Sequence, residues 1–113
     1  MVLLYDGVNA VDVAGPGDAF AAVRNDAGEA GYALTFVAPS GGPVVAESGL
    51  RLLPESTVGA EFSWKGSAAG RSPAGGAVDR RVARCDTLLV PGGRGVREPG
   101  TLRHLATWIE RHH

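Results

Sequence analysis

The chain has 113 residues, of which 44% are hydrophobic and 20% are charged, and its net charge at pH 7 is −1. This length favours one small domain, because a second independent core would need more chain. The composition is too apolar for a wholly disordered polypeptide. The balanced charge argues against direct nucleic-acid binding, which requires a clustered basic face. We therefore expect one globular domain that does not bind nucleic acid itself.

Cys85 is the only cysteine, so the sequence offers no internal disulfide and no zinc site of the cysteine type. A reducing compartment suits such a chain. The apolar run at residues 2–5 is too short for a signal peptide and lacks a basic leader. No apolar stretch reaches the roughly 18 residues of a membrane span. We expect a cytoplasmic protein that does not associate with membranes.

The first part of the chain alternates strand and helix signals, as α/β folds do. The continuous apolar run Val2–Tyr5 predicts a strand buried on both faces, which is typical of parallel sheets. A helix is expected over Asp12–Asp26, with Pro16 in its first turn and glycines after its end. A second strand is expected over Tyr32–Ala38. Together these segments predict a βαβ unit with a right-handed crossover.

The next residues give a hairpin signal and then lose regular patterning. Val44–Ala46 and Leu50–Leu53 are short strand candidates separated by a turn, which predicts a β-hairpin. Residues 59–84 are rich in glycine, serine and basic side chains. They are interpreted as a flexible insertion, or alternatively as the product of a shifted reading frame.

Regular patterning returns near residue 86. Thr87–Val90 is expected to be a buried strand that ends in a glycine-rich turn. Leu102, Leu105 and Ile109 then recur at helical spacing and predict an amphipathic helix.

Four short motifs, in this order, resemble a known family. They are Tyr5–Gly7, Asp12–Pro16, Glu47–Leu50 and Asp86–Gly93. Together they resemble the N-terminal part of the ThiJ/PfpI superfamily of class I glutamine-amidotransferase-like domains, over residues 2–57 and 86–113. The resemblance is nearest to the branch containing AraC/XylS-type transcriptional regulators and isonitrile hydratases.

The resemblance implies an α/β fold of the flavodoxin type, with three layers and helices on both faces of a parallel sheet. We expect residues 1–113 to form a single incomplete domain of this kind, truncated before the elbow that carries the family's nucleophilic cysteine. Such a domain would expose strand edges and apolar faces. Homo-oligomerisation or self-association through an exposed sheet edge is therefore expected.

The resemblance also places Asp12 at the acidic position of the family motif, which makes it the candidate catalytic residue. In the family this carboxyl group points at the cysteine thiolate. It would donate a hydrogen bond in its protonated form, or act as a general acid/base in a buried setting near a like charge. The residues alone allow a simpler alternative, in which Asp12 caps the helix that begins there.

Gly92 and Gly93 match the family's turn whose backbone N–H groups help to form an oxyanion hole. Glycine suits that role because the chain must turn tightly and bring unshielded amides close to a substrate. A plain turn between a strand and a loop also favours two glycines. Both interpretations stay open from the sequence.

Cys85 is not expected to be a nucleophile, because it precedes the strand Thr87–Val90 and ligands in open α/β sheets gather at the carboxyl ends of strands. A structural thiol is the preferred interpretation. His104, His112 and His113 do not have the spacing of a metal site, and the last two suit the end of a helix. No metal and no cofactor is expected.

The resemblance suggests a catalytically incomplete domain like the N-terminal sensor domain of AraC-type transcriptional regulators, with a small molecule as its possible ligand. The alternative is an enzyme of the hydratase or amidase kind, similar to isonitrile hydratase, with Asp12 as its acid/base. A third possibility, a non-catalytic interaction through the exposed sheet edge, rests on no motif.

Overall fold

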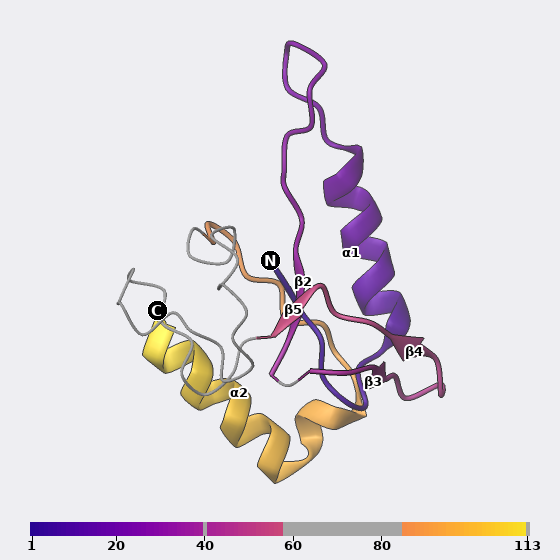
Figure 1. Cartoon of the computed structure of the whole chain (residues 1–113), viewed down its shortest axis with the longest axis vertical. Coiled ribbons are helices and arrows are strands. Elements are labelled where there is room, and N and C mark those ends of the chain that lie inside the picture. Colours follow the sequence, from indigo (N-terminus) through magenta and orange to yellow (C-terminus); the bar gives the residue numbers. More distant parts are fainter. Residues whose placement is uncertain (40, 58–84, 113) are drawn as a thin grey trace.

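The computed structural model describes residues 1–39, 41–57 and 85–112, and Figure 1 shows their course. The expected insertion at residues 59–84 lies outside the described residues. In chain order the elements are β1 (Val2–Leu3), α1 (Ala10–Ala22), β2 (Phe36–Ala38), β3 (Val44–Val45), β4 (Arg51–Leu52), β5 (Ser56–Thr57), the 3₁₀ turn η2 (Arg94–Arg97) and α2 (Pro99–His112).

A small parallel sheet with β1 near its centre organises these elements. β1 pairs with β2, and β2 pairs with β5, in both cases in parallel. On the other side of β1, the Leu3 N–H donates to the Leu89 carbonyl at 3.0 Å and the Leu89 N–H donates to the Met1 carbonyl at 2.9 Å. The parallel order is therefore the Leu89 segment, β1, β2 and β5. With its helices, this mixed α/β arrangement is consistent with a partial flavodoxin-like fold.

The strands are shorter than the sequence predicted. The strand expected over Tyr32–Ala38 is regular only from Phe36, and the strand expected over Thr87–Val90 forms a single β-bridge, at Leu89. Because the Val2 N–H donates to the Thr35 carbonyl at 2.8 Å, residues 32–34 extend past the start of β1. No strand among the described residues lies opposite them, which explains why pairing begins late.

Helix α1 begins before Asp12. Asn9 is its N-cap, and the Asn9 side-chain oxygen accepts the Val11 N–H at 3.0 Å. Asp12 lies in the first turn instead, so the interpretation of Asp12 as the cap is wrong. The helix also ends at Ala22, earlier than the expected Asp26, because Val23 adopts an extended conformation.

The predicted hairpin is confirmed. β3 and β4 pair antiparallel, and the chain reverses between them at Gly49, whose φ is +88°. The Ala46 N–H donates to the Leu50 carbonyl at 2.8 Å and closes the turn. The C-terminal helix is confirmed too, although α2 spans more residues than the predicted apolar positions 102–109. Neither helix in the described part of the chain combines the length and hydrophobicity that crossing a bilayer requires.

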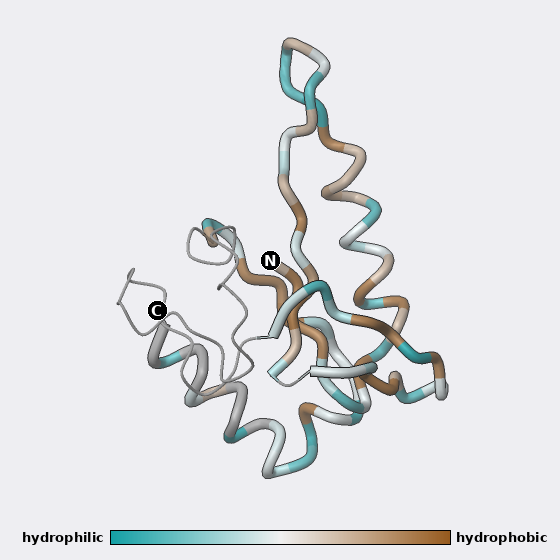
Figure 2. The backbone as a smooth tube through the Cα atoms, in the orientation of Figure 1, coloured by the Kyte–Doolittle hydropathy of each residue, from teal (hydrophilic) through white to brown (hydrophobic). Residues whose placement is uncertain are grey.

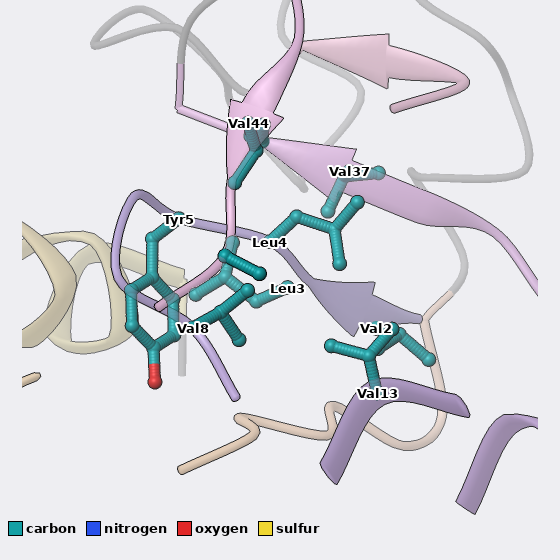
Figure 3. Close-up of a cluster of buried hydrophobic side chains, with 10 residues drawn as sticks. Val2, Leu3, Leu4, Tyr5, Val8, Val13, Val37 and Val44 are labelled. Carbon is teal, nitrogen blue, oxygen red and sulfur yellow. The ribbon is translucent and has the colours of Figure 1, made fainter. Parts of the chain in front are cut away.

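The hydrophobic core surrounds β1. Leu3, Val8 and Val37 are fully buried, each with 0% of its surface exposed. Figure 3 shows the buried side chains gathered around β1, with contributions from α1, β2 and β3. In Figure 2 the apolar stretch of β1 runs through the centre of the described chain, while the loop that follows α1 is largely hydrophilic at its tip. Burial of each such side chain contributes roughly 1.5–3 kcal/mol.

A close backbone contact joins η2 to the loop after β1. The Gly95 N–H donates to the Gly7 carbonyl at 3.0 Å. A Cβ atom at Gly95 would overlap the Asp6 carbonyl oxygen and would lie 2.9 Å from the Tyr5 ring. Only a residue without a side chain allows this approach, because the opposing atoms are mainly backbone and a buried ring.

We expect Gly95→Ala to lower the free energy of unfolding by roughly 1–3 kcal/mol, since the added methyl group must displace this packed backbone. Urea unfolding followed by circular dichroism measures the change. Gly100→Ala is the matched control, because a Cβ at Gly100 would meet no atom within 4 Å. Equal unfolding midpoints for the two variants would contradict the packing described here.

Candidate functional site

The carboxyl ends of β1 and of the Leu89 segment meet at one edge of the sheet, and the start of α1 lies there too. A Cβ atom built on Gly92 would lie only 2.6 Å from an Asp12 carboxylate oxygen. The carboxylate therefore sits directly against the glycine turn. The structure thus brings together Asp12 and Gly92, two residues that the sequence had placed 80 positions apart in one candidate site.

The turn presents backbone amides at this edge. Among residues 1–39, 41–57 and 85–112, the N–H groups of Gly92 and Gly93 donate to no acceptor. The next two amides are occupied, because the Arg94 N–H donates to Glu47 and the Gly95 N–H donates to Gly7, both at 3.0 Å. Two amide donors that have no acceptor among the described residues, beside a carboxylate, would suit a small oxygen-bearing group.

Gly93 is required by its backbone conformation and its packing. Its φ is +150°, a region that side chains rarely allow. A Cβ at Gly93 would lie 2.6 Å from the Asn9 nitrogen and 2.7 Å from the Val8 Cα. The lack of a side chain at Gly93 is therefore required for the tight turn.

Asp12 is exposed, which contradicts the buried setting expected for an acid/base. It stands in the first turn of α1, at the open edge of the sheet, and no described residue encloses it. Its carboxylate can therefore meet a ligand that arrives from solvent.

Glu47 is the site residue whose role sequence analysis missed. Its side chain is 27% exposed, and its two carboxylate oxygens accept hydrogen bonds from Asn9 and Arg94. The signal in the sequence was its position in the Glu47–Leu50 motif. Only the folded β3–β4 hairpin brings Glu47 to its hydrogen-bond partners at this edge of the sheet.

Tyr5 lies beneath the same edge. It is 3% exposed, and its hydroxyl donates to the Pro91 carbonyl just before the glycine turn. Figure 3 shows the hydroxyl pointing away from the apolar cluster. Burial raises the pKa of the Tyr5 phenol above its ordinary value of 10.0, and the carboxylates of Asp12 and Glu47 raise this pKa further. The phenol therefore stays protonated and keeps donating its hydrogen bond.

Cys85 lies at the opposite edge of the sheet. With Met1, Tyr32 and Thr35 it lines a cleft of about 490 Å³ at the amino ends of the strands. Its thiol donates to the Thr87 carbonyl at 3.1 Å. This placement agrees with its interpretation as a structural thiol, away from Asp12.

The described residues contain no group of three or more histidine, cysteine, aspartate and glutamate side chains arranged to hold a metal ion. Of the three histidines considered from the sequence, the side chains of His104 and His112 and the whole of His113 lie outside the described part of the structure.

A parallel α/β sheet with an acidic residue on its first helix, set against a glycine turn after a later strand, is consistent with a partial flavodoxin-like domain. Comparison with protein families agrees with this class. The model of the DJ-1/PfpI family matches residues 1–112, and the chain belongs to this family. The superfamily expected from the sequence motifs is thereby confirmed. No curated protein matches the chain.

We expect Tyr5 to ionise above pH 10.0 in the folded chain, and nearer that value after unfolding. Because the folded pKa is raised, the native state holds this proton more tightly than the unfolded state does. The resulting stabilisation is fully present below about pH 10 and decreases as pH rises through the folded pKa.

Ultraviolet absorbance titration of a Tyr32→Phe variant isolates Tyr5, because the chain has two tyrosines. Asp12→Asn should lower the pKa of Tyr5, since it removes one of the two carboxylates. Ionisation of Tyr5 at the same pH in the folded and unfolded states would refute this account of its environment.

Proposed function

We propose that this DJ-1/PfpI domain is a ligand-binding sensor domain of the kind found in AraC-type transcriptional regulators. The observation that carries the proposal is the contact of the Asp12 carboxylate with Gly92, beside the N–H groups of Gly92 and Gly93, which donate to no acceptor in the described part of the chain. Two amide donors suit a carbonyl or amide oxygen. An adjacent carboxylate suits an N–H or O–H group of the same ligand.

The charges at this edge favour a neutral ligand. Asp12 and Glu47 contribute two carboxylates, and the nearby cation, Arg94, is engaged with Glu47. An anionic ligand would meet repulsion from Asp12 that Arg94 does not offset. A small neutral molecule with one acceptor and one donor is therefore the proposed class.

Cys85 takes no part in the candidate site. The single cysteine of the chain, Cys85, lies at the amino edge of the sheet and cannot reach a ligand held between Asp12 and Gly92. In the sensor role these groups hold the ligand and form no covalent bond with it.

A hydratase or amidase activity is the second candidate, and the same contact between Asp12 and Gly92 favours it. For an isonitrile, one water molecule adds to give an N-substituted formamide, with one hydrogen on carbon and one on nitrogen. Asp12 would transfer these protons, and the glycine amides would stabilise the developing oxygen charge.

N-cyclohexylformamide and cyclohexyl isocyanide are suitable probes for separating these roles. We expect saturable changes in the amide resonances of Gly92 and Gly93 with the formamide, and no conversion of the isocyanide to formamide. Gly92→Ala should weaken binding by about tenfold or more, because its methyl group would collide with the Asp12 carboxylate.

Gly100→Ala is again the matched control, since its Cβ meets nothing. Formation of N-cyclohexylformamide that is lost in Asp12→Asn would support the enzyme over the sensor. Absence of both binding and conversion would overturn the ligand class proposed for this site.

We also propose that the lateral edge of the sheet, formed by the segment Leu88–Val90 beside β1, mediates self-association. Leu89 directs its N–H and carbonyl to β1, so the backbone groups of Leu88 and Val90 point away from β1. The side chain of Val90 is 38% exposed. An edge of this kind can pair with a second copy of the chain.

Val90→Lys should shift the protein toward a lower mass in sedimentation velocity experiments, because a charged side chain disfavours pairing at an edge. Leu53→Lys serves as the control, since Leu53 is 76% exposed and lies away from this edge. A monomeric wild-type protein at high concentration would rule out self-association through this edge.

A further inference from the structure

Glu47 links the two segments that build the candidate site. One carboxylate oxygen, Oε1, accepts a hydrogen bond from Asn9 Nδ2 at 3.2 Å. The other, Oε2, accepts the backbone N–H of Arg94 at 3.0 Å. One side chain thus reaches both the start of α1 and the glycine turn.

The bond to Asn9 acts on the segment that carries Asp12. Asn9 caps α1 through its bond from the Val11 N–H, and its own backbone N–H donates to the Gly92 carbonyl at 2.8 Å. Asp12 follows three residues later, in the first turn. Fixing the Asn9 side chain therefore fixes the start of the helix from which the Asp12 carboxylate extends.

The bond to Arg94 acts on the turn. The Gly93–Arg94 peptide is rigid and planar, so holding the Arg94 N–H also sets the direction of the Gly93 carbonyl. The guanidinium adds a second link, because Arg94 Nη2 donates to the Glu47 carbonyl at 3.0 Å. Arg94, which follows Gly93, is therefore held at both its backbone and its side chain.

The hairpin does not need the Glu47 carboxylate for its own attachment. The Gly7 N–H donates to the Val45 carbonyl at 2.8 Å, and the Glu47 N–H donates to the Val8 carbonyl at 2.9 Å. These backbone bonds already hold the β3–β4 hairpin against the loop after β1. The carboxylate is thus left to act on Asn9 and Arg94.

We propose that Glu47 is a positioning residue, whose carboxylate holds the start of α1 and the Gly92–Gly93 turn at a fixed separation. A single ligand can then meet the glycine amides and Asp12 together. The consequence for the ligand rests on the function proposed above. The link itself involves only residues of this chain, and it is measurable without a ligand.

The first measurement follows backbone amide resonances by NMR. In the wild-type protein the Arg94 amide resonance should move as the Glu47 carboxylate is protonated, because this amide donates to it. Glu47→Gln should abolish that pH-dependent movement. Glu55→Gln is the matched control, since it removes the same charge from a carboxylate that accepts the Phe36 N–H instead.

Hydrogen exchange then separates positioning from general stability. In Glu47→Ala the Asn9 amide, which donates to Gly92, should exchange at least about tenfold faster. The Leu4 amide, which donates to Val37 at 2.7 Å within the sheet, should keep its rate. Glu47→Gln should also lower the pKa of Tyr5, because the Glu47 carboxylate contributes to raising that pKa.

Equal acceleration of the Asn9 and Leu4 amides would overturn the proposal, because it would mean that Glu47 stabilises the whole fold and not the site edge. An Arg94 amide whose pH dependence survives Glu47→Gln would overturn it as well. Binding of N-cyclohexylformamide is tested separately. If the wild-type protein fails to bind it while the Arg94 and Asn9 results hold, the ligand class fails and the positioning role stands.

Discussion

The close contact between the glycine turn and the loop after β1 is the constraint on which the rest of this edge depends. The Asn9 N–H donates to the Gly92 carbonyl, the Gly95 N–H donates to the Gly7 carbonyl, and Cβ atoms at Gly93 and Gly95 would collide with backbone. Because these two segments approach so closely, residues more than 80 positions apart lie at one edge of the sheet. The contact also buries Tyr5 beneath the turn.

Around this contact the side chains are held by hydrogen bonds, whereas the core is held by apolar packing. Glu47 and Asn9 bond across the gap between the hairpin and α1, and Tyr5 donates to the carbonyl of Pro91. Burial raises the pKa of this phenol, and the carboxylates of Asp12 and Glu47 raise the pKa further, so the phenol remains a donor to the turn. The hydrogen bonds of Glu47 and Tyr5 therefore contribute to the geometry of this edge.

The sequence predicted those features that depend on local patterns. Local patterns predicted the apolar run of β1 and the hairpin around Gly49, whereas the family resemblance placed Asp12 and the glycine turn in one site. The residues allow Asp12 as a helix cap, because Pro16 suits a first turn, whereas Asn9 is the cap in the structure. Glu47 was missed because its partners come from two distant segments. Only the folded hairpin brings its carboxylate to them.

The contacts that orient the site are present before any ligand binds. The Asp12 carboxylate and the glycine amides are set by bonds from Asn9 and Glu47, which form when the chain folds and need no ligand. A ligand then meets groups that are already oriented, so little ordering cost is left to oppose its binding. The same fixed donors are what a hydration reaction needs beside a developing oxygen charge. Preorganisation therefore serves sensing and catalysis alike. Asp12 is exposed at this site and Cys85 lies at the amino ends of the strands, so a ligand held here would contact Asp12 and the glycine turn but not this thiol.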